Sequence, residues 1–101
     1  MRIVLEGFDW DEGNLDKCTK HGLTRSEVEE FFTREVTLMA DAKHSREERR
    51  FIAYGSGPQS RLVLVGFTYR EREGRILLRP ISARYMHIKE VKRYEKETSK
   101  V

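Results

Sequence analysis

The chain has 101 residues, with 20 Lys and Arg, 17 Asp and Glu, and one cysteine, Cys18. A chain of this length forms one domain around one core, so we expect residues 1–101 to be a single domain. One cysteine excludes an internal disulfide, and no apolar run approaches the roughly 18 residues that cross a membrane. We therefore expect a soluble, cytoplasmic protein with no membrane partner.

The charge is distributed unevenly along the chain. Residues 1–60 carry 9 Lys and Arg against 12 Asp and Glu, a net charge of −3, whereas residues 61–101 carry 11 against 5, a net charge of +6. A basic half of this kind favours an acidic partner such as nucleic acid. The alternative is that part of this charge is only the solvated face of a final helix.

The first third of the sequence predicts a strand and two helices. Ile3–Phe8 is a short strand candidate. Asp11 is a suitable N-cap for a helix over residues 12–21, which Gly22 would end at the C′ position. The second helix has the strongest local signature, because the segment Thr24–Glu27 has the residues of a capping box.

Four strands and a final helix are expected in the rest of the chain. The predicted strands are Val36–Ala40, Arg49–Tyr54, Arg61–Tyr69 and Arg75–Ser82. In Arg61–Tyr69 both alternate sets of side chains are largely apolar, which is typical of a central strand covered on both faces. Residues 84–97 align Tyr85 with later apolar residues at helical spacing. The order βααββββα indicates an α+β domain, with a mainly antiparallel sheet packed by helices.

The run ILLRPISAR ends an apolar strand in a polar cluster of Arg79, Ser82 and Arg84. Arginine is rarely buried without a partner, so two guanidiniums beside a hydroxyl favour an anion site, with phosphate as the natural ligand. The sequence leaves a second interpretation open, in which these arginines pair with acidic neighbours such as Glu48 or Glu90.

Histidine is the natural candidate for acid–base chemistry at neutral pH. His21 fits this role, although a histidine just before a glycine at a helix end also serves as a C-terminal cap. We expect His44 in a polar loop and His87 on the last helix, neither near a second ligand-type residue, and phosphate-cradling glycine loops are absent. We therefore expect no metal and no cofactor.

Four motifs resemble those of one family in their order and spacing. They are FDWD at Phe8–Asp11, KHG at Lys20–Gly22, HSREERRF at His44–Phe51 and ISAR at Ile81–Arg84. The chain resembles the BrnT family of ribonuclease toxins from type II toxin–antitoxin systems. It departs from the family pattern at Lys17, where Asn is usual, and in a segment Trp10–His21 that is one residue shorter. Pro80 replaces an aliphatic residue, which favours a sheet edge or a bulge.

The resemblance implies a fold, an activity and a partner. The fold would be a compact RelE-like domain, and the activity metal-independent endoribonuclease cleavage of RNA that inhibits translation and growth. The partner would be a BrnA-like ribbon-helix-helix antitoxin in a 2:2 heterotetramer. Operator DNA would be contacted only through the antitoxin.

RNA cleavage without a metal needs a base for the 2′-hydroxyl, stabilisation of the phosphorane and an acid for the 5′-oxygen. A rigid guanidinium fork suits the phosphorane. Arg50 matches the family arginine of the ERRF motif, although an ion pair with Glu48 is equally compatible with its position. The expected catalytic residues are Arg50, Arg79, Arg84 and His21, and the expected RNA contacts are Lys17, Lys20, Thr68, Arg70 and Ser82.

Two other classes of function remain compatible with the same residues. The first is a nucleic-acid-binding regulator that uses the basic face without catalysis. The second is a module that binds the antitoxin and has lost the activity, which the departure at Lys17 would permit.

Overall fold

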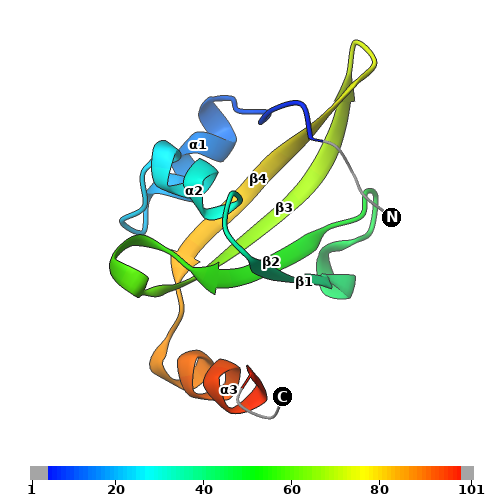
Figure 1. Ribbon diagram of the computed structural model, residues 1–101. Helices are drawn as coiled ribbons and strands as arrows, with labels where there is room; N and C mark the ends of the chain where they lie inside the picture. The colour runs from blue at the N-terminus through cyan, green and yellow to red at the C-terminus, as the bar shows by residue number, and fades with distance from the viewer. Residues whose placement is uncertain (1–4, 99–101) are drawn as a thin grey trace.

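The computed structural model describes residues 5–98, which form one antiparallel sheet with three helices (Figure 1). The strand order in the sheet is β1-β2-β3-β4, and every pairing is antiparallel. The elements are α1 (Glu12–Thr19), α2 (Arg25–Phe31), β1 (Val36–Ala40), η1 (Ala42–His44), β2 (Phe51–Ser56), η2 (Pro58–Ser60), β3 (Leu62–Arg72), β4 (Arg75–Tyr85) and α3 (Ile88–Thr98). The predicted α+β class is confirmed.

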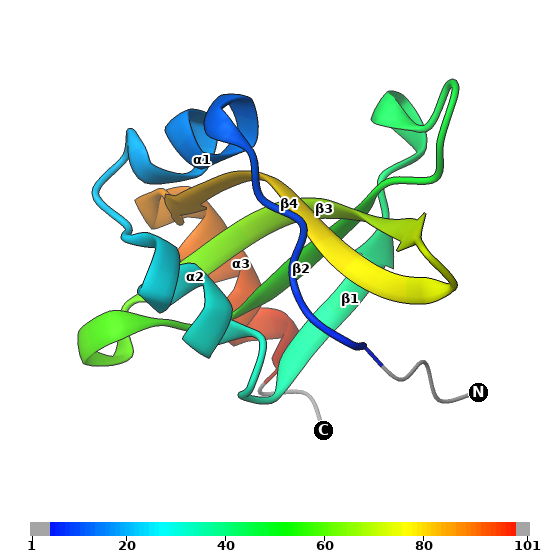
Figure 2. The same cartoon turned by 90° about the horizontal axis from the view of Figure 1, so that it is seen from above.

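The helices divide between the two faces of the sheet. Figures 1 and 2 show α1 and α2 on one side, with α3 on the opposite side. None of the helices among residues 5–98 has both the length and the apolar composition needed to cross a membrane.

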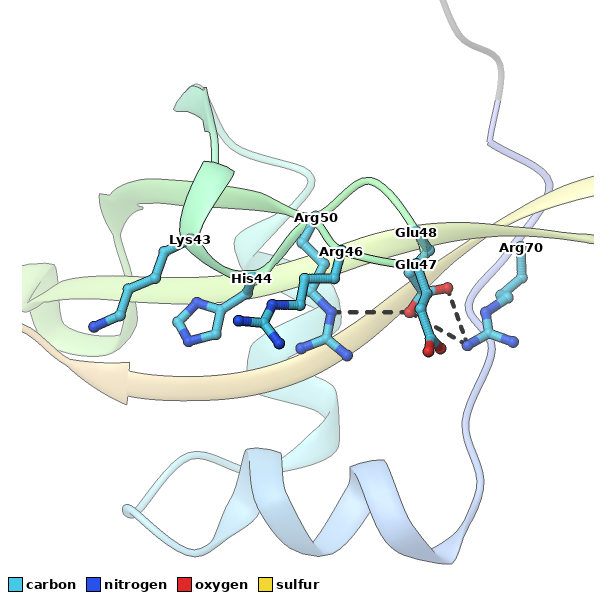
Figure 3. Close-up of a pocket in the computed structure, with 7 residues that line it drawn as sticks. All are labelled: Lys43, His44, Arg46, Glu47, Glu48, Arg50 and Arg70. Atoms are coloured by element: carbon cyan, nitrogen blue, oxygen red, sulfur yellow. Dashed lines mark hydrogen bonds and ion pairs between the residues drawn. The ribbon is translucent and has the colours of Figure 1, made fainter.

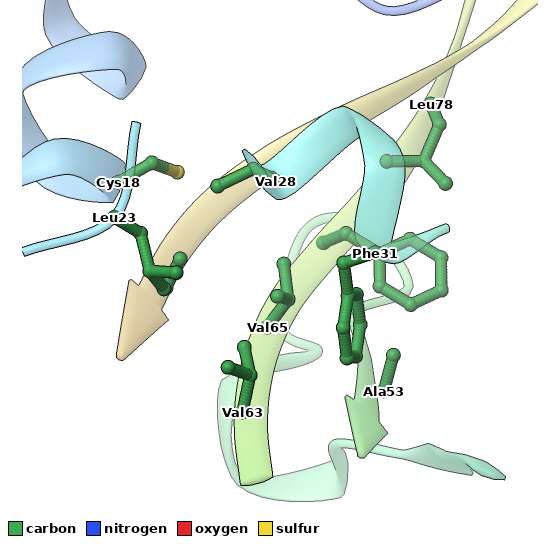
Figure 4. Packing of buried hydrophobic residues seen from close by; sticks show 10 residues of the cluster. Cys18, Leu23, Val28, Phe31, Ala53, Val63, Val65 and Leu78 are labelled. Carbon is green, nitrogen blue, oxygen red and sulfur yellow. The ribbon is translucent and has the colours of Figure 1, made fainter. Parts of the chain in front are cut away.

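The core lies between β3 and the two N-terminal helices. Val63 and Val65 point from β3 toward α2 (Figure 4). Both are almost fully buried, as are Phe67 of the same strand and Val28 and Phe31 of α2. Side chains alternate along a strand, so Leu62, Leu64 and Gly66 lie on the other face, where they are half-buried. β3 pairs with β2 on one edge and with β4 on the other, so the prediction of a central strand is confirmed, although its second face is covered only in part.

Both N-terminal helices begin at a capping box. In α1 the Asp11 side chain accepts from the Asn14 N–H and the Asn14 side chain accepts from the Asp11 N–H; Thr24 and Glu27 do the same in α2. The predicted end of the first helix is wrong. It ends at Thr19, and Gly22 (φ +96°) lies in the turn that brings the chain into the core before α2.

The N-terminal strand expected at Ile3–Phe8 falls partly outside the described residues. Within them, the segment runs parallel to β4 and makes a single bridge, between Phe8 and Leu78. Gly7, with φ +144°, departs from strand geometry and interrupts a regular ladder. The segment nevertheless covers the outer edge of β4 through the backbone hydrogen bonds of Glu6 and Asp9.

β4 is longer than predicted, and the final helix begins later. Arg84 is opposite Leu64 in the ladder, and Met86 still donates its N–H to the Leu62 carbonyl. These bonds keep residues 84–86 extended, so the helix starts at Ile88 instead of residue 84.

The turn between β3 and β4 is tight, because only residues 73 and 74 lie between the strands, and both have positive φ.

The pairing of β3 with β4 contains a register shift at Pro80. Gly66 is opposite Ser82, whereas Phe67 is opposite Pro80, so Ile81 is an extra residue on β4. A proline cannot donate to a ladder, and a bulge is one of the few sites in a sheet where it is tolerated. The sequence predicted either a sheet edge or a bulge at Pro80, and both are found, because β4 is also the last strand of the sheet.

Substituting Phe67→Ala tests the position of the core. Phe67 is 1% exposed and its ring contacts those of Phe32 and Phe51, so we expect a loss of about 3–5 kcal/mol in the free energy of unfolding. Chemical denaturation measures this loss. Leu38→Ala is the control: Leu38 is 52% exposed on edge strand β1, and we expect a change within about 0.5 kcal/mol. Equal losses in the two variants would contradict the assigned core.

Candidate functional site

A basic cleft lies between the β1–β2 loop, β3, β4 and α1. It consists of two adjoining hollows, of about 770 and about 220 Å³, that share Glu48, Arg50 and Arg70. The larger hollow is also lined by Lys43, His44, Arg46 and Glu47, and the smaller by Gly13, Asn14, Lys17, Arg79 and Ile81. Six cationic side chains thus meet two acidic ones, which gives the cleft an excess of positive charge.

Two arginines at the centre of the cleft share one carboxylate. Arg70 Nη2 lies 3.2 Å from one carboxylate oxygen of Glu48, and Arg50 Nε lies 3.8 Å from the other (Figure 3). The Nε atoms of Arg50 and Arg70 are buried, and neither has a hydrogen-bond partner among the described residues. Buried donors without partners are uncommon and suit an acceptor-rich ligand such as a phosphate.

The loop that supplies Arg50 is closed by its own backbone. The Asp41 N–H donates to the Arg50 carbonyl (2.8 Å), the Ser45 hydroxyl to the Asp41 carbonyl (2.6 Å), and the Arg50 N–H to the Ser45 hydroxyl (3.0 Å). Thr68 of β3 adds a bond from its hydroxyl to the Arg49 carbonyl. These bonds fix the position of Arg50 relative to β3 and therefore to Arg70.

Sequence reasoning included Arg50 of the β1–β2 loop in the site but missed Lys43, His44 and Arg46 of the same loop. His44 lines the larger hollow beside Lys43 and Arg46, and its Nδ1 lies 2.8 Å from Asp41 Oδ2. In Figure 3 the side chains of His44 and Arg46 extend from the loop on the same side as Arg50, whereas Lys43 points away from Arg50. The signal in the sequence was the high density of charged residues around His44, which by itself does not indicate a contact with the cleft.

Arg79 lines the smaller hollow but already has two partners. Its guanidinium lies 2.8 Å from Asp11 and 3.4 Å from Asp9, and its side chain is 17% exposed. Partial burial alone would lower the pKa of Arg79, but the hydrogen bond with Asp11 and the charges of both aspartates raise it overall. Arg79 is therefore a permanently charged side chain held in one position.

Arg84 lies outside the basic cleft. Two of its nitrogens contact the two carboxylate oxygens of Glu90, at 2.7 and 3.0 Å, and Glu90 also accepts the His87 N–H at the start of α3. This hydrogen bonding lowers the pKa of Glu90 to about 2. The sequence alternative in which Arg84 pairs with Glu90 is the arrangement observed, and it ties α3 to β4.

The other predicted site residues divide between the cleft and the surface. Lys17 lines the smaller hollow, whereas Lys20 and His21 lie exposed in the turn after α1 and line neither hollow. Thr68 is buried by its bond to the loop, and Ser82 is exposed opposite Gly66. The structure therefore brings Lys17, Arg50, Arg70 and Arg79 together.

Cys18 is unsuited to nucleophilic chemistry. Its side chain is fully buried in the core, and burial raises its pKa to about 11. Among residues 5–98, no three His, Cys, Asp or Glu side chains are grouped so that they would hold a metal ion.

Comparison with known families identifies what kind of chain carries this cleft. The family described as the ribonuclease toxin BrnT of type II toxin–antitoxin systems matches residues 10–90. The chain belongs to the BrnT family. Every residue that lines the cleft falls within the matched range, and most of α3 falls outside it. No curated protein matches the chain.

The Arg84–Glu90 pair predicts a pH-dependent loss of stability in this BrnT chain. The pKa of Glu90 is depressed from its ordinary value of 4.5 to about 2, so the pair stabilises the fold above pH 4.5 and is lost as the pH falls toward 2. We expect Glu90→Gln to have a lower free energy of unfolding than the parent at neutral pH. The two free energies should converge as the pH falls from 4.5 toward 2. Denaturation at several pH values measures this.

The control for this measurement is Glu97→Gln on the same helix. Glu97 pairs with Arg93 at the surface, where both side chains are mostly exposed and such a pair contributes little at any pH. The difference in the free energy of unfolding between Glu90→Gln and the parent could instead stay constant from neutral pH to about pH 2. This result would show that the Arg84–Glu90 pair does not cause the difference.

Proposed function

We propose that this chain is the toxin of a type II toxin–antitoxin system and an endoribonuclease that cleaves RNA in the basic cleft without a metal ion. Cleavage would inhibit translation and growth in the cytoplasm. Membership of the BrnT family supports a ribonuclease. The observation that carries the proposal is the pair Arg50 and Arg70, whose buried Nε atoms have no hydrogen-bond partner among the described residues.

The two central arginines suit the phosphate that is cleaved. In-line attack by the 2′-oxygen produces a phosphorane with additional negative charge on its oxygens, and fixed guanidiniums stabilise that charge more than the ground state. Glu48 holds both guanidiniums in the free protein. An arriving phosphate would take the place of this carboxylate as their shared anionic partner.

The remaining cations have different tasks in this proposal. Lys17, Lys43 and Arg46 line the cleft and attract the RNA backbone on either side of the cleaved bond. Arg79 contributes a fixed positive charge at the end of the cleft near α1. Arg84 has the structural role of holding α3.

Adjacent arginines provide a matched test. Arg50→Ala removes a guanidinium from the cleft, and we expect RNA cleavage in excess EDTA to fall by about 10²- to 10³-fold. Arg49→Ala makes the same change in charge one residue away, at an exposed side chain that lines neither hollow, and should cleave at nearly the parent rate. Single-turnover cleavage of a labelled RNA measures both.

Two outcomes would contradict this function. Equal loss in Arg49→Ala and Arg50→Ala would mean that overall charge, and not the cleft, carries the effect. A parent protein that binds RNA with salt-dependent affinity and leaves it intact would be a nucleic-acid-binding regulator.

The proposal includes a protein that neutralises the toxin. We propose a BrnA-like ribbon-helix-helix antitoxin, two copies of which would hold two toxins in a 2:2 heterotetramer and contact operator DNA. The six cations of the cleft offer an acidic segment of the antitoxin both attraction and a site to block.

Salt dependence tests where the antitoxin binds. If it covers the cleft, the association rate should fall by about tenfold or more between about 50 and 500 mM salt, because screening removes the attraction. Stopped-flow mixing of the purified proteins measures the rate. A rate that is indifferent to salt would place the antitoxin on another surface.

A further inference from the structure

His44 and Asp41 form a hydrogen-bonded pair at the edge of the basic cleft. His44 Nδ1 lies 2.8 Å from Asp41 Oδ2, and His44 lines the larger hollow together with Arg50 and Arg70. An ionised carboxylate only accepts hydrogen bonds, so the Nδ1 atom carries the proton that is donated to Asp41. In the neutral imidazole the Nε2 atom is then left with a free lone pair, which is the form that accepts a proton.

The backbone holds this pair in place independently of its side chains. Asp41 donates its N–H to the Arg50 carbonyl and accepts the His44 N–H (3.2 Å) and the Ser45 hydroxyl at its own carbonyl. The Asp41 side chain makes no capping bond to η1, and it is only 16% exposed. Among the described residues, the Asp41 carboxylate hydrogen-bonds to His44.

The same bonds fix the pair relative to the phosphate-binding residues. Asp41 and Arg50 stand opposite each other where the loop closes, 2.8 Å apart between N and O, and Ser45 bridges them. The backbone positions that carry the proton acceptor and the guanidinium are therefore fixed relative to each other by one closed loop, which favours a joint role in acid–base catalysis.

We propose that His44 is the general base of the cleavage reaction and that Asp41 is its positioning residue. This rests on the proposed ribonuclease function. His44 Nε2 accepts the proton of the 2′-hydroxyl while the 2′-oxygen bonds to phosphorus. The bond from phosphorus to the 5′-oxygen breaks, and that oxygen takes a proton from water. The products are a 2′,3′-cyclic phosphate and a 5′-hydroxyl, and the imidazolium returns its proton to solvent.

Asp41 supports this step in two ways. Its hydrogen bond sets the tautomer of the imidazole, and its charge stabilises the imidazolium that forms. The other charged groups that face His44 in the larger hollow are Lys43, Arg46, Glu47, Glu48, Arg50 and, from β3, Arg70. Asp41 differs from all of them in its direct hydrogen bond to the imidazole.

The test compares three histidine variants of the full chain on one labelled RNA. We expect His44→Gln to lower the single-turnover cleavage rate by about 10²- to 10⁴-fold and to abolish the acid limb of its pH profile. Binding of an RNA with a 2′-deoxy group at the cleaved position should be unchanged. His87→Gln, at an exposed site just before α3 that lines neither hollow, should keep both rate and profile.

Two further measurements separate catalysis from structure. Imidazole added to His44→Ala should restore part of the cleavage rate, which a structural role would not allow. Asp41→Asn should lower the rate and displace the acid limb while circular dichroism stays unchanged, because the backbone bonds of residue 41 remain.

The outcomes distinguish this proposal from the ribonuclease proposal itself. A parent protein that cleaves no RNA overturns the proposed function. A parent that cleaves RNA while His44→Gln keeps the rate and the acid limb overturns only the role of His44. If His21→Gln loses the acid limb instead, the base is His21 in the turn after α1.

Discussion

The interruption of the β3–β4 ladder at Pro80 is the constraint on which the site depends. Pro80 has no N–H, so the pairing shifts there and Ile81 becomes an extra residue. The shift places Arg79 on the same face of the sheet as Ser82. In a regular strand, two residues three positions apart would lie on opposite faces. The Pro80 carbonyl accepts the side-chain N–H of Asn14 (2.7 Å) and so anchors α1 to β4. Both α1 and the bulge residue Ile81 line the smaller hollow of the cleft.

A cluster of cations must be held together against its own repulsion. Carboxylates offset this repulsion, with aspartates at the ends of the cleft and one glutamate at its centre. Asp9 is buried between Arg72 and Arg79, and Glu48 lies between Arg50 and Arg70. Each of these carboxylates fixes two guanidiniums, so the cleft keeps a net positive charge while its arginines keep defined positions.

Local signals predicted most of the fold, and contacts distant in sequence decided the rest. The capping box of Thr24–Glu27 and the two apolar faces of β3 depend on neighbouring residues, so the sequence was sufficient. The end of β4 at Tyr85 depends on pairing with β3, which overrides a helical pattern that began at residue 84. The contribution of His44 depends on the folding of a polar loop over β3, and no local pattern indicates such a contact.

The arginines of this chain differ in function because they differ in their partners. Arg84 has a carboxylate to itself and, like Arg79 with its two aspartates, would have to break strong ion pairs to bind a phosphate. Arg50 and Arg70 share one carboxylate and retain buried donors without a partner among the described residues. Arg50 and Arg70 are therefore better suited to bind an anion than Arg79 or Arg84. Residue type alone does not separate these four arginines, whereas the partners of each guanidinium do.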